Sequence, residues 1–166
     1  LANKTDEAFR QLVEYFEQQT EPTIIVMFGD HQPSVEQEFL DMAYGVSEDG
    51  MTMEQYMGRF RVPFVLWANY DIEEDYIETT SLNYLSTLLV EKAGLPLSPW
   101  QNYLKNLSES YPAITANAWM DDEGKWHSNT AQNITGEKDG GNLNDYRILN
   151  YYHLFDGAHR DDRLFE

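Results

Sequence analysis

Apolar residues recur at helical spacing near the start of the chain. Thr5 can cap a helix there, because its hydroxyl can accept from a free backbone N–H of the first turn. The pair Glu21-Pro22 ends the segment, since the residue before a proline disfavours helix. Its apolar stripe falls at positions i, i+3, i+4 and i+7 and comprises Phe9, Leu12, Val13 and Phe16. The pattern predicts a surface helix with one buried face.

Two further helices are expected after residue 78. Thr79 or Thr80 caps the first, and Gly94 followed by Pro96 ends it. Ser98-Pro99 opens the second, because proline suits the first helical position. The apolar positions of the two helices are Leu82, Leu85, Leu88 and Leu89, and then Trp100, Tyr103, Leu104 and Leu107.

Two continuous apolar runs, residues 23–28 and 62–68, predict strands. Neither alternates with polar residues, which favours strands buried on both faces, as in a parallel sheet. The connection between the runs contains Met51, Met53 and Met57 and is expected to form a short helix.

The last third of the chain predicts a hairpin over 113–128, a polar loop over 129–142 and a final helix. Residues 121–124 supply the hairpin turn, and Asn142 can cap a helix that runs through Phe155. The fold class expected is α/β, a mostly parallel sheet flanked by helices with a C-terminal hairpin and helix. Because two strands make a poor sheet, this sheet is expected to be incomplete.

Composition narrows the function classes. The chain has 11 Lys and Arg residues and 29 Asp and Glu residues, which gives a formal net charge of −18. That balance argues against nucleic-acid binding and against electrostatic docking on anionic lipid. The chain has no cysteine, which excludes thiol catalysis and cysteine metal sites. No stretch has the roughly 18 apolar residues of a membrane span, and Leu1 stands where an initiator Met would, so we expect an excerpt of a longer product.

One short segment contains candidate metal ligands. Asp30 and His31 directly follow the first strand, between Gly29 and Pro33, and ligands bind at the carboxyl ends of strands in open α/β sheets. We expect Gly29 to let the chain turn sharply out of the strand. A carboxylate and an imidazole suit Zn²⁺ or Mn²⁺ and suit Mg²⁺ or Ca²⁺ less well. The alternative is that Asp30 caps a turn and His31 is solvated.

Four ordered segments are similar to a known family: TIIVMFGDHQPS, VPFVLWANYDIEE, TSLNYLSTLLVEKAGLPLSPWQNYL and LNDYRILNYYHLFD. They resemble the C-terminal part of the lipoteichoic acid synthase-like phosphoglycerol transferases, which belong to the sulfatase and alkaline phosphatase superfamily. The resemblance implies that residues 1–166 are the C-terminal portion of one sulfatase-like catalytic domain. It also implies that Asp30 and His31 are two ligands of a divalent metal, Mn²⁺ first, with Mg²⁺ or Zn²⁺ possible.

In this family the nucleophile is a Thr well upstream of the Asp-His pair, as is a further carboxylate ligand. The resemblance therefore assigns no catalytic residue to this chain and implies that it is inactive alone. The implied substrate is an anionic glycerophospholipid such as phosphatidylglycerol, used by a membrane-anchored parent protein at the extracellular face of a bacterial membrane. Arg59 and Arg61 are candidate counter-charges for it, although arginines there are more often surface anchors.

Two other functions stay open. One is hydrolysis by a sulfatase, phosphatase or phosphodiesterase with the same metal chemistry. The other is a non-catalytic surface module that binds a glycan or a protein through aromatic side chains. Core packing is the simpler expectation for Trp100, Trp119 and Trp126. His127, His153 and His159 are expected at a rim, in the core and in the charged tail, none of them as a metal ligand.

Overall fold

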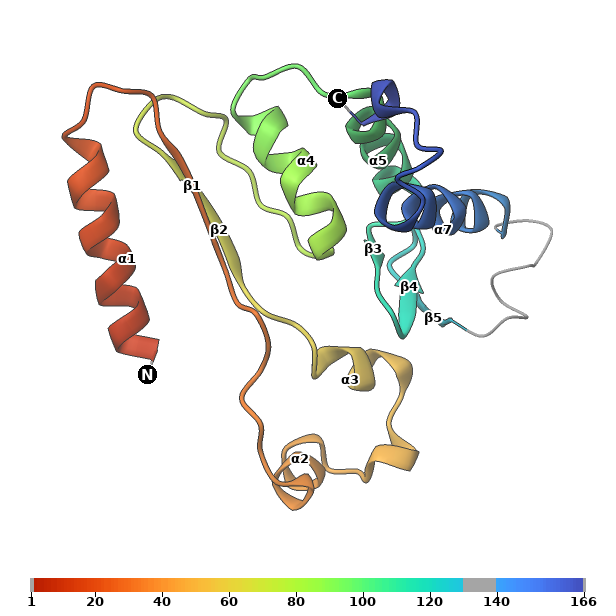
Figure 1. The fold of residues 1–166 in the computed structure, drawn as a ribbon. Coiled ribbons are helices and arrows are strands. Elements are labelled where there is room, and N and C mark those ends of the chain that lie inside the picture. Colours follow the sequence, from red (N-terminus) through yellow and green to blue (C-terminus); the bar gives the residue numbers. More distant parts are fainter. Residues whose placement is uncertain (1, 130–139, 166) are drawn as a thin grey trace. The chain divides into compact units, whose positions relative to one another are not determined.

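The computed structural model describes residues 2–129 and 140–165, which fall into two compact units. The first comprises Leu1–Met51 and Gln55–Tyr76, and the second comprises Thr52–Glu54 and Ile77–Glu166. Figure 1 labels the elements of both. The mixed α/β class is confirmed. None of the described helices is long and apolar enough to cross a membrane.

The first unit contains a two-stranded antiparallel ribbon. Strands β1 (Ile24–Phe28) and β2 (Phe64–Ala68) pair with Ile24 opposite Ala68 and Phe28 opposite Phe64. The expected parallel pairing of these runs is wrong. The pattern established that both are strands rich in apolar residues, but that composition does not fix strand direction. The ribbon is also less buried than expected, since Phe28 and Val65 are 46% and 42% exposed.

Three helices accompany the ribbon: α1 (Ala2–Glu17), α2 (Gln37–Tyr44) and the 3-10 turn η1 (Glu48–Gly50). Helix α1 begins at Ala2, before the expected cap at Thr5, and its stripe is half-buried except for the exposed Leu12. The expected methionine-rich helix is present as α3 (Met53–Gly58). Helix α2 was not expected, although five of its eight residues are apolar or aromatic: Phe39, Leu40, Met42, Ala43 and Tyr44.

Asn69 ties the end of α1 to the ribbon. Its side-chain nitrogen lies 3.0–3.2 Å from the carbonyl oxygens of Phe16, Gln19 and Glu21, and its side-chain oxygen accepts from the Thr23 N–H at 2.8 Å. One amide therefore connects the last turn of α1 and the residues after it to the start of the ribbon.

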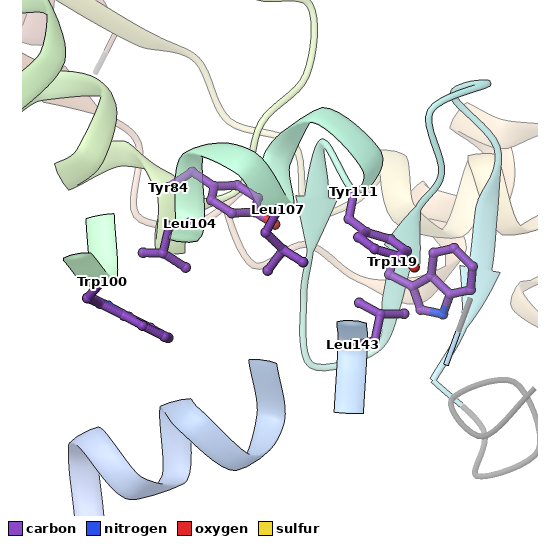
Figure 2. Packing of buried hydrophobic residues seen from close by; sticks show 7 residues of the cluster. All are labelled: Tyr84, Trp100, Leu104, Leu107, Tyr111, Trp119 and Leu143. Atoms are coloured by element: carbon purple, nitrogen blue, oxygen red, sulfur yellow. The ribbon is translucent and has the colours of Figure 1, made fainter. Parts of the chain in front are cut away.

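The second unit contains helices α4 (Leu82–Lys92), α5 (Pro99–Ser110) and α7 (Gly140–Phe155), and the 3-10 turn η2 (Asp162–Leu164). Seven buried residues form its core, and Figure 2 shows their side chains: Tyr84, Trp100, Leu104, Leu107, Tyr111, Trp119 and Leu143. Helix α5 begins at Ser98-Pro99 as expected, and a capping box is present there: the Ser98 hydroxyl accepts from the Gln101 N–H, and the Gln101 side chain accepts from the Ser98 N–H.

The expected hairpin is a three-stranded antiparallel meander of β3 (Ala113–Ile114), β4 (Ala118–Met120) and β5 (Trp126–Ser128). Gly124 occupies the left-handed position of its turn, with φ of 80°. The buried Trp100, Trp119 and Trp126 confirm the core expectation for the tryptophans.

Two helix starts differ from expectation. Ser81, not Thr79 or Thr80, is the N-cap of α4, and its hydroxyl oxygen accepts from the Ile114 N–H at 2.9 Å instead of capping the helix. Tertiary pairing with β3 thus overrides the local capping preference. Helix α7 already includes Gly140, so Asn142 lies inside it. Most of the expected 129–142 loop lies outside the described residues.

Stability of the second unit should fall in alkali. Burial raises the pKa of Tyr84 and Tyr146, and it raises the pKa of Tyr103 to about 12. The folded state therefore keeps phenol protons that the unfolded chain releases above pH about 10. The stabilisation is complete below that pH and is lost as pH rises through the folded-state pKa values. We expect a lower urea midpoint at pH 11 than at pH 8.

Tyr84→Phe should reduce this alkaline loss, because it removes the most deeply buried of the three titrating groups. Tyr151→Phe, which alters an exposed ring on α7, is the matched control and should keep it. Equal urea midpoints for the wild type at pH 8 and pH 11 would contradict the prediction.

Candidate metal centre

The chain leaves β1 through Gly29, which lies against the residue preceding β2. The Gly29 N–H donates to the Pro63 carbonyl at 3.0 Å, so the ladder continues one step beyond the strand. A Cβ on Gly29 would lie 2.7 Å from Cβ of Val62, closer than side chains approach. Gly29 is not among the described glycines with positive φ, which are Gly45, Gly94 and Gly124. The glycine is therefore needed for close packing, and the bend expected where the chain leaves the strand is present at Asp30 without a positive φ at Gly29.

Asp30 and His31 converge after this point. The Asp30 Oδ2 atom lies 3.4 Å from His31 Nε2, and Asp30 Oδ1 accepts from the His31 backbone N–H at 2.9 Å. The two side chains therefore present an oxygen and a nitrogen to the same small region.

Gln32 holds the imidazole in place, a role that sequence reasoning missed. His31 Nδ1 lies 2.8 Å from the Gln32 carbonyl oxygen, so Nδ1 carries the proton and donates it there. The Gln32 side-chain amide in turn donates to the Arg61 carbonyl, across the ribbon. In the neutral ring, this arrangement leaves Nε2 as the unprotonated nitrogen beside Asp30. Only the position of Gln32 next to His31 could have suggested it.

The pair fits a divalent cation. Two donors that each lie about 2.0–2.2 Å from one ion are about 2.8–3.6 Å apart in octahedral or tetrahedral geometry, and the observed separation is 3.4 Å. Histidine ligands commonly donate their other ring N–H to a backbone carbonyl, as His31 does to Gln32. Carboxylate oxygen and imidazole nitrogen together suit Mn²⁺ and Zn²⁺.

The pair is accessible and incomplete. The side chains of His31 and Asp30 are 75% and 84% exposed, and an exposed pair of this kind contributes only about 0–1 kcal/mol to folding. The fold therefore does not explain their placement. Within residues 2–129 and 140–165, no group of three or more His, Asp or Glu side chains is arranged to hold a metal. At this place the described chain thus provides two donor atoms for a metal ion.

The other histidines have structural surroundings. His127 lies 2.5 Å from Asp121 and stacks on Trp119, with ring centroids 4.2 Å apart. Burial alone would raise the pKa of Asp121, but hydrogen bonds from His127 and from the backbone of Lys125 and Glu123 lower it. The turn thus holds a carboxylate that the sequence spacing did not reveal as a partner of His127.

His153 and His159 lie in the second unit. His153 stacks on Phe165, with centroids 4.1 Å apart, which confirms its expected place against the aromatic core. His159 is exposed and lies 2.7 Å from Asp156. Neither belongs to a group of three ligands in the described chain.

Arg59 is a structural residue. Its guanidinium lies 3.0 Å from a carboxylate oxygen of Glu48 and covers the ring of Tyr56. The anchor alternative is therefore favoured for Arg59. Arg61 is exposed, and its carbonyl receives the Gln32 side chain.

Comparison with known proteins agrees with the geometry. The sulfatase family model matches residues 1–95, a segment that includes Asp30 and His31. The chain belongs to the sulfatase family. This supports the superfamily that the sequence resembled, without singling out its lipoteichoic acid synthase-like members. No solved structure matches the chain.

One curated relative is similar along nearly the whole chain. It is a putative cyclic beta-1,2-glucan modification protein of Rhizobium meliloti, 24% identical over 166 residues. The match covers 98% of this chain and 26% of the relative, so the chain spans about a quarter of that protein's length. Sulfatase-superfamily proteins are enzymes and generally use divalent metals, which the donor pair suits.

Gly29→Ala should destabilise the first unit. The added Cβ would require a shift of Val62, and overpacking of this kind costs about 1–3 kcal/mol. Chemical denaturation measures the change, and Val62→Gly in the same chain should recover part of it. Gly157→Ala is the control, because a Cβ there meets no atom within 4 Å. A Gly29→Ala variant as stable as the Gly157→Ala variant would contradict the packing argument.

Proposed function

We propose that this sulfatase-family chain supplies two ligands, Asp30 and His31, to the divalent metal of a phosphoglycerol transferase. The observation that carries the proposal is the 3.4 Å approach of Asp30 Oδ2 to His31 Nε2 at the end of β1. The accessibility of both side chains supports it, because a donor pair must reach further ligands and substrate. Mn²⁺ is the first candidate, with Mg²⁺ and Zn²⁺ as alternatives.

A divalent cation held there would act as a Lewis acid toward a phosphoryl oxygen and favour ionisation of a hydroxyl nucleophile. Asp30 contributes one negative charge and His31 none, so the donor pair leaves a bound dication with net positive charge. That local positive charge would attract an anionic substrate, which the net charge of −18 on the chain would otherwise repel. Gln32 fixes the His31 ring through the Nδ1 hydrogen bond.

The donor substrate in this proposal is an anionic glycerophospholipid, and a Thr upstream of this chain is the nucleophile. The P–O bond to the lipid alcohol breaks as a P–O bond to that Thr forms, and the group then passes to an acceptor hydroxyl. A glycan acceptor is supported by the relative whose name describes modification of cyclic beta-1,2-glucan. The parent protein would act at the extracellular face of a bacterial membrane, and this chain alone would be inactive.

Hydrolysis is the second candidate, and the sulfatase family match favours it. Water instead of an alcohol would then accept the phosphoryl or sulfuryl group. The same two ligands serve either reaction, because the acceptors differ in the pocket that positions them.

Asp30→Asn and His31→Gln should each weaken Mn²⁺ binding to this chain, because each replaces one of two donors. Titration monitored by Mn²⁺ electron paramagnetic resonance measures the free ion. The Asp156→Asn, His159→Gln double variant is the control, since it removes an exposed Asp-His pair of similar spacing elsewhere. Equal Mn²⁺ affinity for the wild type and Asp30→Asn would contradict the ligand assignment.

In the longer protein that includes the nucleophile, Asp30→Asn should lower transfer by at least about 100-fold, since metal stabilisation supplies several kcal/mol. Labelled phosphatidylglycerol and cyclic glucan are the substrates, and the products are separated by mass. Glycerophosphoryl glucan supports transfer, whereas free glycerophosphate alone supports the hydrolytic alternative. Undiminished transfer by Asp30→Asn would overturn both.

A further inference from the structure

A small pocket in the second unit lies outside the Asp30–His31 site. It has a volume of about 180 Å³ and is bounded by α4, α5, the residues before α4 and Pro112. The lining residues that have polar groups are Thr79, Thr80, Tyr84, Thr87, Glu91, Lys105 and Ser108. Hydroxyl groups therefore dominate the polar part of the wall.

Thr87 is the residue that points to a ligand. It is 3% exposed, and its hydroxyl has no hydrogen-bond partner within the described part of the chain. A helical Thr can bond to the carbonyl four residues earlier, but the Thr87 hydroxyl makes no such bond to the described chain. A buried hydroxyl without a partner costs about 1–3 kcal/mol, and a hydroxyl group of a bound molecule would remove that cost.

The charges of the pocket favour a neutral ligand. Lys105 Nζ lies 2.5 Å from a carboxylate oxygen of Glu91, so the two ionised groups of the wall neutralise each other. A phosphate there would approach Glu91 and would compete with it for Lys105. A neutral molecule leaves the ion pair intact and can hydrogen-bond to both groups.

Apart from the ring of Tyr84, the remaining wall is aliphatic. Leu88 and the buried Leu104 face the same space as the hydroxyl groups. A sugar ring matches this mixture, because it presents C–H groups on its faces and hydroxyls at its edge. The volume is below the roughly 300–1,000 Å³ of sites that enclose drug-sized ligands, which limits the pocket to about one sugar unit.

We propose that this pocket binds one uncharged hexose unit of a glucan, with Thr87 hydrogen-bonded to a sugar hydroxyl. The choice of a glucan as the source rests on the proposed function, whereas the ligand class follows from the pocket itself. Binding here requires neither metal nor transfer, so it can be measured separately from both.

The test uses this chain in buffer with EDTA and sophorose, the β-1,2-linked glucose disaccharide, as the probe. Calorimetry or NMR titration measures the dissociation constant. Thr87→Val should weaken binding about 3- to 10-fold, the effect of one net hydrogen bond. The same variant should unfold at an equal or higher urea concentration without sugar, because its hydroxyl has no protein partner to lose.

Ser108→Phe should abolish binding by filling the pocket, whereas Ser110→Phe, on the same helix but outside the wall, should not change it. Far-UV circular dichroism checks that both variants fold; if Ser108→Phe does not, Thr87→Val carries the test. Failure of the wild type to bind sophorose, unchanged affinity in Thr87→Val, or tighter binding of glycerol phosphate than of sophorose would each overturn the proposal. None of these outcomes involves Asp30 or His31. The proposed transferase function is therefore tested independently of sugar binding.

Discussion

The close approach of Gly29 to Val62 determines what the candidate site can do. Backbone and side chain meet there because glycine has no Cβ, and the Gly29 N–H bond to the Pro63 carbonyl extends the antiparallel ladder beyond β1. The segment that follows is therefore held to the ribbon at two points, Gly29 and the Gln32 side chain. Between these points Asp30 and His31 are free to face solvent and each other. A rigid base below two exposed donors is the arrangement that ligand preorganisation requires.

The hydrogen bond from His31 Nδ1 to the Gln32 carbonyl gives this arrangement its chemistry. In the neutral ring it sets the tautomer, so that Nε2 offers a lone pair on the side of Asp30. If Nδ1 carried no proton, Nε2 would donate to the Asp30 carboxylate, and the two atoms would satisfy each other as a simple hydrogen-bonded pair. The second interpretation of the sequence, a capping Asp and a solvated His, stays open, because Asp30 Oδ1 accepts from the His31 backbone N–H and the His31 side chain is 75% exposed. Exposed groups of little value to folding keep a defined geometry here through backbone contacts alone.

The sequence predicted local features well and their pairing poorly. The runs at 23–28 and 62–68, the helix start at Ser98-Pro99 and the turn at Gly124 all follow from side-chain chemistry within a few residues, and all are present. The antiparallel direction of β1 and β2 was missed because apolar composition is the same for either direction. Ser81 was missed as the N-cap of α4 because its hydroxyl is used by Ile114, 33 residues away. At the candidate site the donors were predicted by residue type, whereas the roles of Gly29 and Gln32 depend on Val62 and Arg61, contacts that only the folded ribbon creates.

The strongly negative chain constrains both proposed sites in the same way. At a net charge of −18, an anionic group gains affinity only where positive charge is concentrated. Among the described arginines near β2, Arg59 is already paired with Glu48, so a cation on Asp30 and His31 is the more direct source of that charge. In the pocket lined by Thr87, the charges of Lys105 and Glu91 neutralise each other. The pocket therefore favours an uncharged molecule and does not need added positive charge. Under the two proposals, one chain would serve an anionic donor and a neutral acceptor without an arginine cluster, because a bound metal would supply the positive charge that the donor requires.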